Sequence, residues 1–273
     1  MKKYFFLVIL FVTGAIFADV KMNPNANTLW EMTSLKESSW TGKGVKIVNN
    51  KTGFSLSNNN PSNKAPHSIK RMIPVDKSYP YLVLKTTSIT PYKGYRNWSV
   101  SFRELGSSFG SITNAEPGIM VMNCFENLPK QFTKKQANMM FYFYDFKADF
   151  NYIKMVKKPD NYITATGDFA QKKRIQSGDK VKFTVYLKET AEEVVLKLVF
   201  KKYLYTIKVN GNEIIELTPE DKDQKIWSCE LPIKSLVSTK GKKFKKGEIL
   251  MRATVLGGSI KEPIWTPLQY SFE

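Results

Sequence analysis

Short runs of alternating apolar and polar residues, separated by turn residues, constrain the fold of this chain more than any other feature. The alternation is most regular in two runs of the second half, Val181 to Leu187 and Val194 to Phe200, where every second side chain is apolar. This two-residue period is typical of strands that bury one face. After Leu29 no window of about eleven residues has the 3.6-residue period of an amphipathic helix. The sequence therefore predicts an all-β fold.

Turn residues divide the first half into short apolar runs. Asn58-Asn59-Asn60-Pro61 and Glu116-Pro117-Gly118 are the clearest of these turns. We expect the polar segment from Asp19 to Thr28 to be a loose lead-in. Strands are expected in the apolar runs that follow it, at Val45–Val48, Phe54–Ser57, Ser68–Val75, Tyr81–Thr87, Asn97–Phe102, Gly118–Phe125 and Met139–Phe146.

The second half carries a hairpin signal and a terminal strand. Asn210-Gly211 tolerates the positive φ angles of a type I′ turn and predicts a hairpin around it. The chain closes on the apolar segment from Ile264 to Phe272. Pro263 and Pro267 in this region favour an edge strand, because proline cannot donate to a ladder of hydrogen bonds.

The first 18 residues have the composition of a secretory leader. Lys2 and Lys3 precede an apolar stretch from Phe5 to Phe17, and the small Ala18 stands at the expected cleavage point. The stretch is shorter than the ~20 residues that a membrane-spanning helix needs, although an uncleaved anchor is the alternative. We expect a bacterial signal peptide at 1–18, no transmembrane segment after its removal, and export to the periplasm, the cell surface or the extracellular space.

The length and a change in composition predict two domains. A chain of 273 residues suits one large or two small domains. An aromatic-rich block gives way to a lysine-rich block near Lys157-Lys158-Pro159-Asp160. We expect a jelly-roll β-sandwich at 29–166 and an immunoglobulin-like β-sandwich at 167–273, since about seven strands in roughly a hundred residues is the count of the latter fold.

The order of features in the first domain resembles the galactose-binding-like jelly roll of many carbohydrate-binding modules. Trp30 and Trp40 open the domain, and G-K-G-V-K-I, G-F-S-L, S-I-K-R-M-I-P-V and W-S-V-S-F follow in that order. The second domain is similar, in its fold, to immunoglobulin-like domains of exported bacterial proteins. The resemblance implies binding of a sugar or a surface polymer, but it assigns no functional residues.

The net charge indicates the chemistry of a partner. The formal charge is +18, and both halves of the chain are basic. Such a field favours anionic polymers, among them sulfated or uronic polysaccharide and cell-wall polymers, as well as anionic lipid. The alternative is a generally basic surface with no ligand. Export argues against nucleic acid as a partner.

The segment from Thr90 to Ser99 is the strongest candidate binding site. It places aromatic and cationic side chains together, and flat aromatic rings stack on the C–H faces of sugars while cations suit carboxylated or sulfated units. The candidate ligand-binding residues are Tyr92, Lys93, Tyr95, Arg96 and Trp98. The alternative is that Trp98 belongs to the core and the tyrosines only close a loop.

A second basic patch is possible in the sequence between Lys240 and Lys246, together with Lys172-Lys173-Arg174. Phe244 would be its stacking residue. The alternative is a solvated hairpin tip.

Candidate catalytic and metal-binding residues are few. Asp145 and Asp149 share a face of a predicted strand about 13 Å apart at ~3.3 Å per residue, beyond the ~5–9.5 Å of glycosidase carboxylates. His67 is the only histidine and is expected in a loop, which excludes zinc sites built from several histidines. We expect no cofactor, with a structural calcium ion left open. Cys124 and Cys229 are expected as separately buried thiols and not as a disulfide.

The sequence therefore predicts an exported, non-catalytic protein that binds carbohydrate, preferably an anionic polysaccharide, through aromatic stacking and Lys/Arg contacts. Two alternatives stay open. One is a surface or envelope assembly component whose partner is another protein. The other is a polysaccharide hydrolase that uses carboxylates.

Overall fold

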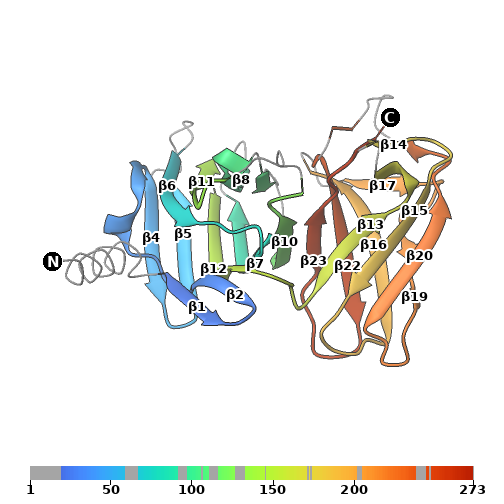
Figure 1. Cartoon of the computed structure of the whole chain (residues 1–273), viewed down its shortest axis with the longest axis horizontal. Helices are drawn as coiled ribbons and strands as arrows, with labels where there is room; N and C mark the ends of the chain where they lie inside the picture. Colours follow the sequence, from blue (N-terminus) through green and yellow to red (C-terminus); the bar gives the residue numbers. More distant parts are fainter. Residues whose placement is uncertain are drawn as a thin grey trace.

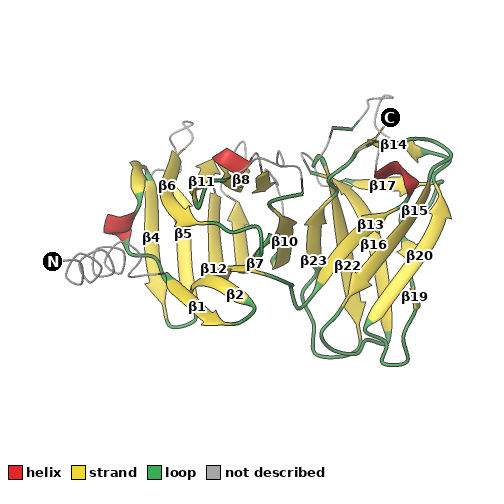
Figure 2. Cartoon of the chain, viewed as in Figure 1, coloured by secondary structure: helices red, strands yellow, loops and turns green. Residues whose placement is uncertain are grey.

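The chain is built almost entirely from strands. The computed structural model describes residues 20–58, 67–91, 97–105, 107–110, 116–126, 133–144, 146–170, 172, 174–201, 205–237, 244–245 and 247–272. Within these residues the helical segments are three short 3-10 turns, η1 (Glu37–Ser39), η2 (Arg103–Leu105) and η3 (Asp168–Ala170) (Figure 2). The predicted all-β class is confirmed. The expected signal peptide lies outside the described residues.

Two facing sheets form the first lobe, residues 20–156 (Figure 1). One face holds β1 (Lys21–Asn25), β2 (Thr28–Met32), β4 (Val45–Asn50), β5 (Gly53–Asn58), β7 (Tyr81–Pro91), β10 (Gly118–Asn123) and β12 (Phe146–Val156). The other holds β3 (Thr41–Lys43), β6 (His67–Pro74), β8 (Asn97–Phe102), β9 (Ser107–Gly110) and β11 (Gln136–Tyr144). Large aromatic side chains fill the space between them, with Trp30, Phe54, Trp98, Phe141 and Phe150 fully buried.

The second lobe, residues 162–272, is also a sandwich. Its four-stranded sheet runs in the order β13 (Tyr162–Thr166), β15 (Lys180–Tyr186), β20 (Ile226–Pro232) and β19 (Thr218–Pro219). The facing strands are β16 (Glu193–Phe200), β17 (Thr206–Val209), β18 (Ile215–Glu216), β21 (Leu236–Val237), β22 (Ile249–Leu256) and β23 (Ile264–Pro267), and β14 (Arg174–Ile175) pairs with β24 (Ser271–Phe272). The predicted alternation holds in β15, where Val181, Phe183 and Val185 are buried.

The two lobes share one sheet. β10 of the first lobe pairs in parallel with β23 of the second, so that thirteen of the described strands form a continuous sheet across the molecule (Figure 1). The Ile119 amide donates to the Pro263 carbonyl at 3.0 Å. A β-carbon on Gly118 would lie 2.4 Å from that same carbonyl oxygen, so glycine is needed for this close approach.

This pairing overturns the expectation of an edge strand near the C-terminus. β23 lies between β10 and β22. The two prolines are tolerated because Pro263 stands just before this four-residue strand and Pro267 is its last residue. There Pro263 serves as an acceptor and no donor is required of it.

The boundary between the two lobes lies earlier in the chain than the expected domain boundary at 166/167. β13 pairs with β15 along its whole length, from Tyr162↔Tyr186 to Thr166↔Lys182, and so belongs to the second lobe. The connection between the lobes is residues 157–161. The expected loose lead-in is also partly wrong, because Lys21–Asn25 pairs with β2 as a strand.

Two local predictions need correction as well. The run Met139–Phe146 is not one strand, because β11 and β12 belong to opposite sheets of the first lobe. The Asn210-Gly211 turn has the expected positive φ angles, 51° and 91°. However, its hairpin closes with only the bridge between Val209 and Asn212, since the strands on either side both pair with β16.

Candidate functional site

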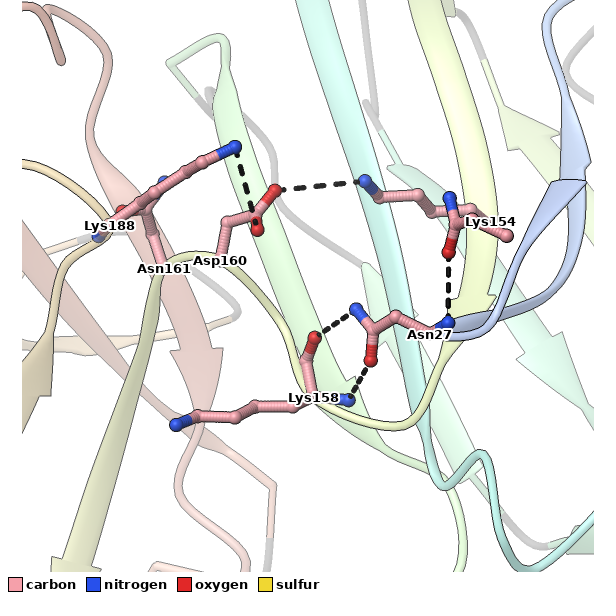
Figure 3. Close-up of polar contacts among 7 residues, drawn as sticks. Asn27, Lys154, Lys158, Asp160, Asn161 and Lys188 are labelled. Carbon is pink, nitrogen blue, oxygen red and sulfur yellow. Dashed lines mark hydrogen bonds and ion pairs between the residues drawn. The ribbon is translucent and has the colours of Figure 1, made fainter.

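The connection between the lobes is fixed by one asparagine. The Asn27 side-chain amide donates to the Lys158 carbonyl at 2.8 Å, and the Lys158 amide donates to the Asn27 side-chain oxygen at 3.0 Å (Figure 3). The Lys157 amide adds a bond to the Asn27 carbonyl at 2.8 Å. Asn27 thus attaches residues 157–158 to the turn between β1 and β2.

Asp160 links the two lobes electrostatically. Figure 3 shows its carboxylate between the ammonium groups of Lys154, on β12, and Lys188, which follows β15. Both N–O distances are 3.9 Å, and Asp160 is about half exposed, with 49% of its side chain accessible. Such exposed pairs are weak. The Lys188 amide also donates to the Asn161 side chain at 3.0 Å.

Three tyrosines form a row at this junction. Tyr81 begins β7, Tyr162 begins β13 and Tyr186 ends β15. Tyr162 and Tyr186 are directly paired across two strands, and their rings stack with centroids 4.5 Å apart at an interplanar angle of 12°. Tyr81 lies 6.0 Å from Tyr162 on the other side, tilted by 43°. All three are half-buried.

A shallow groove of about 450 Å³ lies on the Tyr186 side of this row. We call it the lysine groove, after Lys158, Lys188 and Lys225, which line it together with Tyr162 and Tyr186. Its two carboxylates are already engaged. Asp160 faces two lysines, and one oxygen of Asp221 accepts the backbone amides of residues 225 and 226 at 2.9 and 2.8 Å.

A smaller cavity of about 190 Å³ lies between the lobes on the other side of Tyr162. We call it the inter-lobe cavity. Its lining includes Tyr81, Tyr162, Tyr270, Glu126 and Thr266, and no lysine or arginine among the described residues. Glu126 accepts a hydrogen bond from the Tyr270 hydroxyl.

Burial raises the pKa of three tyrosines that line the inter-lobe cavity, Tyr81, Tyr162 and Tyr270. Burial, followed by the neighbouring Tyr186 and Tyr81, raises the pKa of Tyr162 to about 12. Burial and then the Glu126 carboxylate raise the pKa of both Tyr81 and Tyr270. Like any tyrosine hydroxyl, these three are neutral at physiological pH, where each can both donate and accept a hydrogen bond.

The predicted binding loop is described only in part. Tyr92, Lys93, Tyr95 and Arg96 lie outside the described residues. Trp98 is fully buried, and its ring packs edge-on against Phe150 at 5.9 Å. Trp98 is thus a core residue with no exposed face, because its position on β8 directs the side chain into the core.

The other candidate residues are dispersed. His67 is the first residue of β6 and half-buried, not a loop residue, and its ring would collide with a β-carbon on Gly44. Asp145 lies outside the described residues, while Asp149 on β12 accepts from the Ser55 hydroxyl and pairs with Lys147 at 3.4 Å. Cys124 and Cys229 are both thiols, the first buried and the second half-buried.

The residue that was predicted to stack in the second basic patch, Phe244, is not on the surface. Phe244 is buried in the core of the second lobe, 5.3 Å from Phe200, and its carbonyl accepts the Phe272 amide at 2.9 Å. Within the described residues no cluster of three or more metal-ligating side chains occurs. None of the helices in the described part of the chain is long and apolar enough to cross a membrane.

Sequence reasoning missed the residues of the lysine groove. The one indication in the sequence was Tyr186. It is an aromatic residue on the face of its strand that is otherwise polar, opposite the buried face formed by Val181, Phe183 and Val185. Nothing local indicated that Tyr162 would stack on it, because that contact depends on the pairing of β13 with β15.

Comparisons with known proteins do not assign a family. No family model matches the sequence, and no curated protein is significantly similar to it. Among solved structures, a DUF4785 family protein from Legionella pneumophila is 14% identical at a TM-score of 0.27, covering 85% of this chain. The Endo-D glycoside hydrolase domain from Streptococcus pneumoniae is 9% identical at 0.26, covering 90%. A beta-1,2-glucanase from Parabacteroides distasonis is 7% identical at 0.25, covering 84%.

This chain spans 63%, 38% and 36% of the length of those three proteins, respectively. At such TM-scores the overall structures differ. These likenesses therefore carry no argument about what the chain binds or does.

Proposed function

We propose that this protein is an exported, non-catalytic carbohydrate-binding protein whose ligand is an acidic polysaccharide. The observation that carries the proposal is the stacked pair Tyr162 and Tyr186 with three lysines around it in the lysine groove. The two rings cover each other's inner faces, so the apolar face of a sugar ring would stack on the outer face of Tyr186. The ammonium groups of Lys158, Lys188 and Lys225 would meet its carboxylate or sulfate groups.

The lysines are available for such a ligand. Lys188 is 65% exposed and meets Asp160 only at 3.9 Å, and the Lys225 ammonium is 3.9 Å from Asp223. Exposed ion pairs of this kind contribute little, so an anionic ligand displaces them at small cost. The Lys158 ammonium extends away from the contacts that its backbone makes with Asn27 (Figure 3).

The two hollows do not offer a carboxylate pair suited to glycoside hydrolysis. Such hydrolysis generally needs two carboxyl groups, one of which serves as an acid. In the lysine groove Asp221 caps a turn and Asp160 faces Lys154 and Lys188. Among the described residues that line the inter-lobe cavity, Glu126 is the sole carboxylate. In these two hollows the side chains therefore suit binding of a sugar and not its hydrolysis.

The finer features of the prediction belong to this proposal. We infer a galactose-binding-like jelly roll for the first lobe, an immunoglobulin-like sandwich for the second, and export directed by residues 1–18. The loop residues Tyr92, Lys93, Tyr95 and Arg96 remain a proposed additional contact for the polysaccharide.

The proposal is tested by affinity electrophoresis of the purified chain in gels that contain polygalacturonate, at low and moderate salt. We expect retardation that persists at moderate salt. The variants Tyr186→Ala and Lys188→Ala should each weaken it, Tyr186→Ala by about tenfold, because truncation of an aromatic anchor costs more than about 1 kcal/mol. Tyr186→Phe should retain binding, since the ring remains.

Lys180→Ala is the matched control. Lys180 lies on the same strand as Tyr186, is 73% exposed and stands outside the groove. If it weakens binding as much as Lys188→Ala does, and if moderate salt abolishes retardation, the protein has a generic basic surface and no groove site. The fold of each variant is checked by its thermal transition.

A further inference from the structure

The lysine groove and the inter-lobe cavity adjoin each other. Tyr162 lines both of them. Its ring is stacked on Tyr186 on the groove side, and Tyr81 lies beside it on the cavity side. Among the described lining residues, Tyr162 is therefore the one at which the two hollows meet.

The lysine groove and the inter-lobe cavity carry opposite charges among their described lining residues. The groove has three lysines around its aromatic pair. The cavity has tyrosine rings and a single carboxylate, Glu126, with no cation among its described lining residues. A carboxylate repels an acidic sugar but accepts hydrogen bonds from the hydroxyl or amide groups of an uncharged one.

A polar group that lacks a partner lies in the wall of the cavity. The Thr266 hydroxyl oxygen is buried and makes no hydrogen bond with the described residues. An unsatisfied buried hydroxyl is costly, and a ligand that bonds to it removes that cost. Thr266 lies on β23, the strand that joins the lobes, and the residue lines the cavity between them.

We propose that the inter-lobe cavity is a second subsite, which takes an uncharged sugar unit next to the acidic unit in the lysine groove. The ligand is then a polysaccharide in which acidic and uncharged units alternate, and its chain crosses Tyr162. This inference rests on the proposed function and deepens it, because it names the repeating chemistry of the polymer.

Titration calorimetry with two size-matched probes tests it. One probe is a hyaluronan oligosaccharide, in which glucuronate alternates with N-acetylglucosamine, and the other is an oligogalacturonate, in which every unit is acidic. We expect the full chain to bind the alternating probe more tightly, although it carries fewer charges. Lys188→Ala should weaken the binding of both probes by a similar factor.

Cavity variants separate the two subsites. Thr266→Val keeps the shape of the side chain and removes the hydroxyl. It should weaken the binding of the alternating probe by about two- to tenfold, the contribution of one hydrogen bond. The affinity for the all-acidic probe should not change. Glu126→Gln removes the repulsion and should strengthen the all-acidic probe.

The outcomes distinguish the two proposals. If both probes bind, Tyr186→Ala weakens both, and Thr266→Val and Glu126→Gln change neither, the second subsite is refuted and the proposed function stands. If neither probe binds, or if Tyr186→Ala has no effect on either, the proposed function fails and the inference fails with it.

Discussion

At the scale of single residues, the two cysteines occupy different environments. Cys124 is fully buried, and burial raises the pKa of its thiol to about 12, whereas Cys229 is half-buried, with a pKa raised less by the same cause. Because the thiolate is the reactive form, we expect Cys124 to be inert in the native protein. A thiol reagent at neutral pH should modify Cys229 slowly and Cys124 only after unfolding.

Mass spectrometry of the labelled chain assigns the site of modification. A Cys229→Ser variant is the control and should show no native labelling, while retaining one reactive thiol in denaturant. Native labelling of Cys124 at the rate of Cys229 would contradict the packing described for the first lobe.

The buried tyrosines predict an alkaline limit to stability. Burial raises the pKa of both Tyr152 and Tyr162 to about 12, whereas an unfolded tyrosine titrates near pH ~10. Between these values the folded state binds more protons than the unfolded state. This contribution to stability is therefore complete below about pH 10 and is lost as the pH rises towards 12.

Urea unfolding at a series of alkaline pH values measures this effect. The slope of unfolding free energy against pH should become less steep in Tyr152→Phe, which removes the ionisable group from a buried site. An unchanged slope would show that other groups cause the alkaline instability.

At the scale of elements, the parallel pairing of β10 and β23 depends on Gly118. A β-carbon there would meet the Pro263 carbonyl at 2.4 Å. We expect Gly118→Ala to destabilise the protein by about 1–3 kcal/mol, the usual cost of overpacking a tight site. Urea unfolding gives the free energy of unfolding. The chain has five tryptophans, so the fluorescence of Trp265, which stands on β23, is obtained as the difference from a Trp265→Phe variant, and it reports the junction itself.

Gly211→Ala is the comparison. A β-carbon at Gly211 meets nothing within 4 Å, although its φ of 91° disfavours other residues. Any cost there arises from the backbone alone, and the Trp265 signal should not change. If Gly118→Ala left both stability and fluorescence unaltered, the lobes would not be joined as described.

The elements also show how far the sequence could predict the structure. Strands such as β15 and β16 were predictable because alternation is a local property of the chain. The partner of a strand is not local, so neither the position of β23 beside β10 nor the place of β13 in the second lobe could be predicted. The tyrosine stack of the candidate site follows from that second pairing and was missed for the same reason.

At the scale of the whole molecule, the lobes differ from two domains joined by a linker. They share a sheet, and Trp265 and Leu250 of the second lobe belong to the core cluster of the first. Cross-lobe ion pairs add to this, with Lys85 2.8 Å from Glu262 and Arg252 bound to Glu116. The proposed binding tract that crosses Tyr162 requires this fixed arrangement, because it takes side chains from both lobes.

Such continuity predicts that the protein unfolds as one unit. Calorimetry should show a single transition whose calorimetric enthalpy equals the van't Hoff enthalpy, because opening either lobe exposes the apolar strands of the shared sheet. A fragment of residues 162–273 would present β23 as a bare apolar edge, and we expect it to melt at a lower temperature or to associate. Two separate transitions in the full chain, with the second matching that of the fragment, would instead mean that the lobes are independent, and a binding site between them would then lack the rigidity that its selectivity needs.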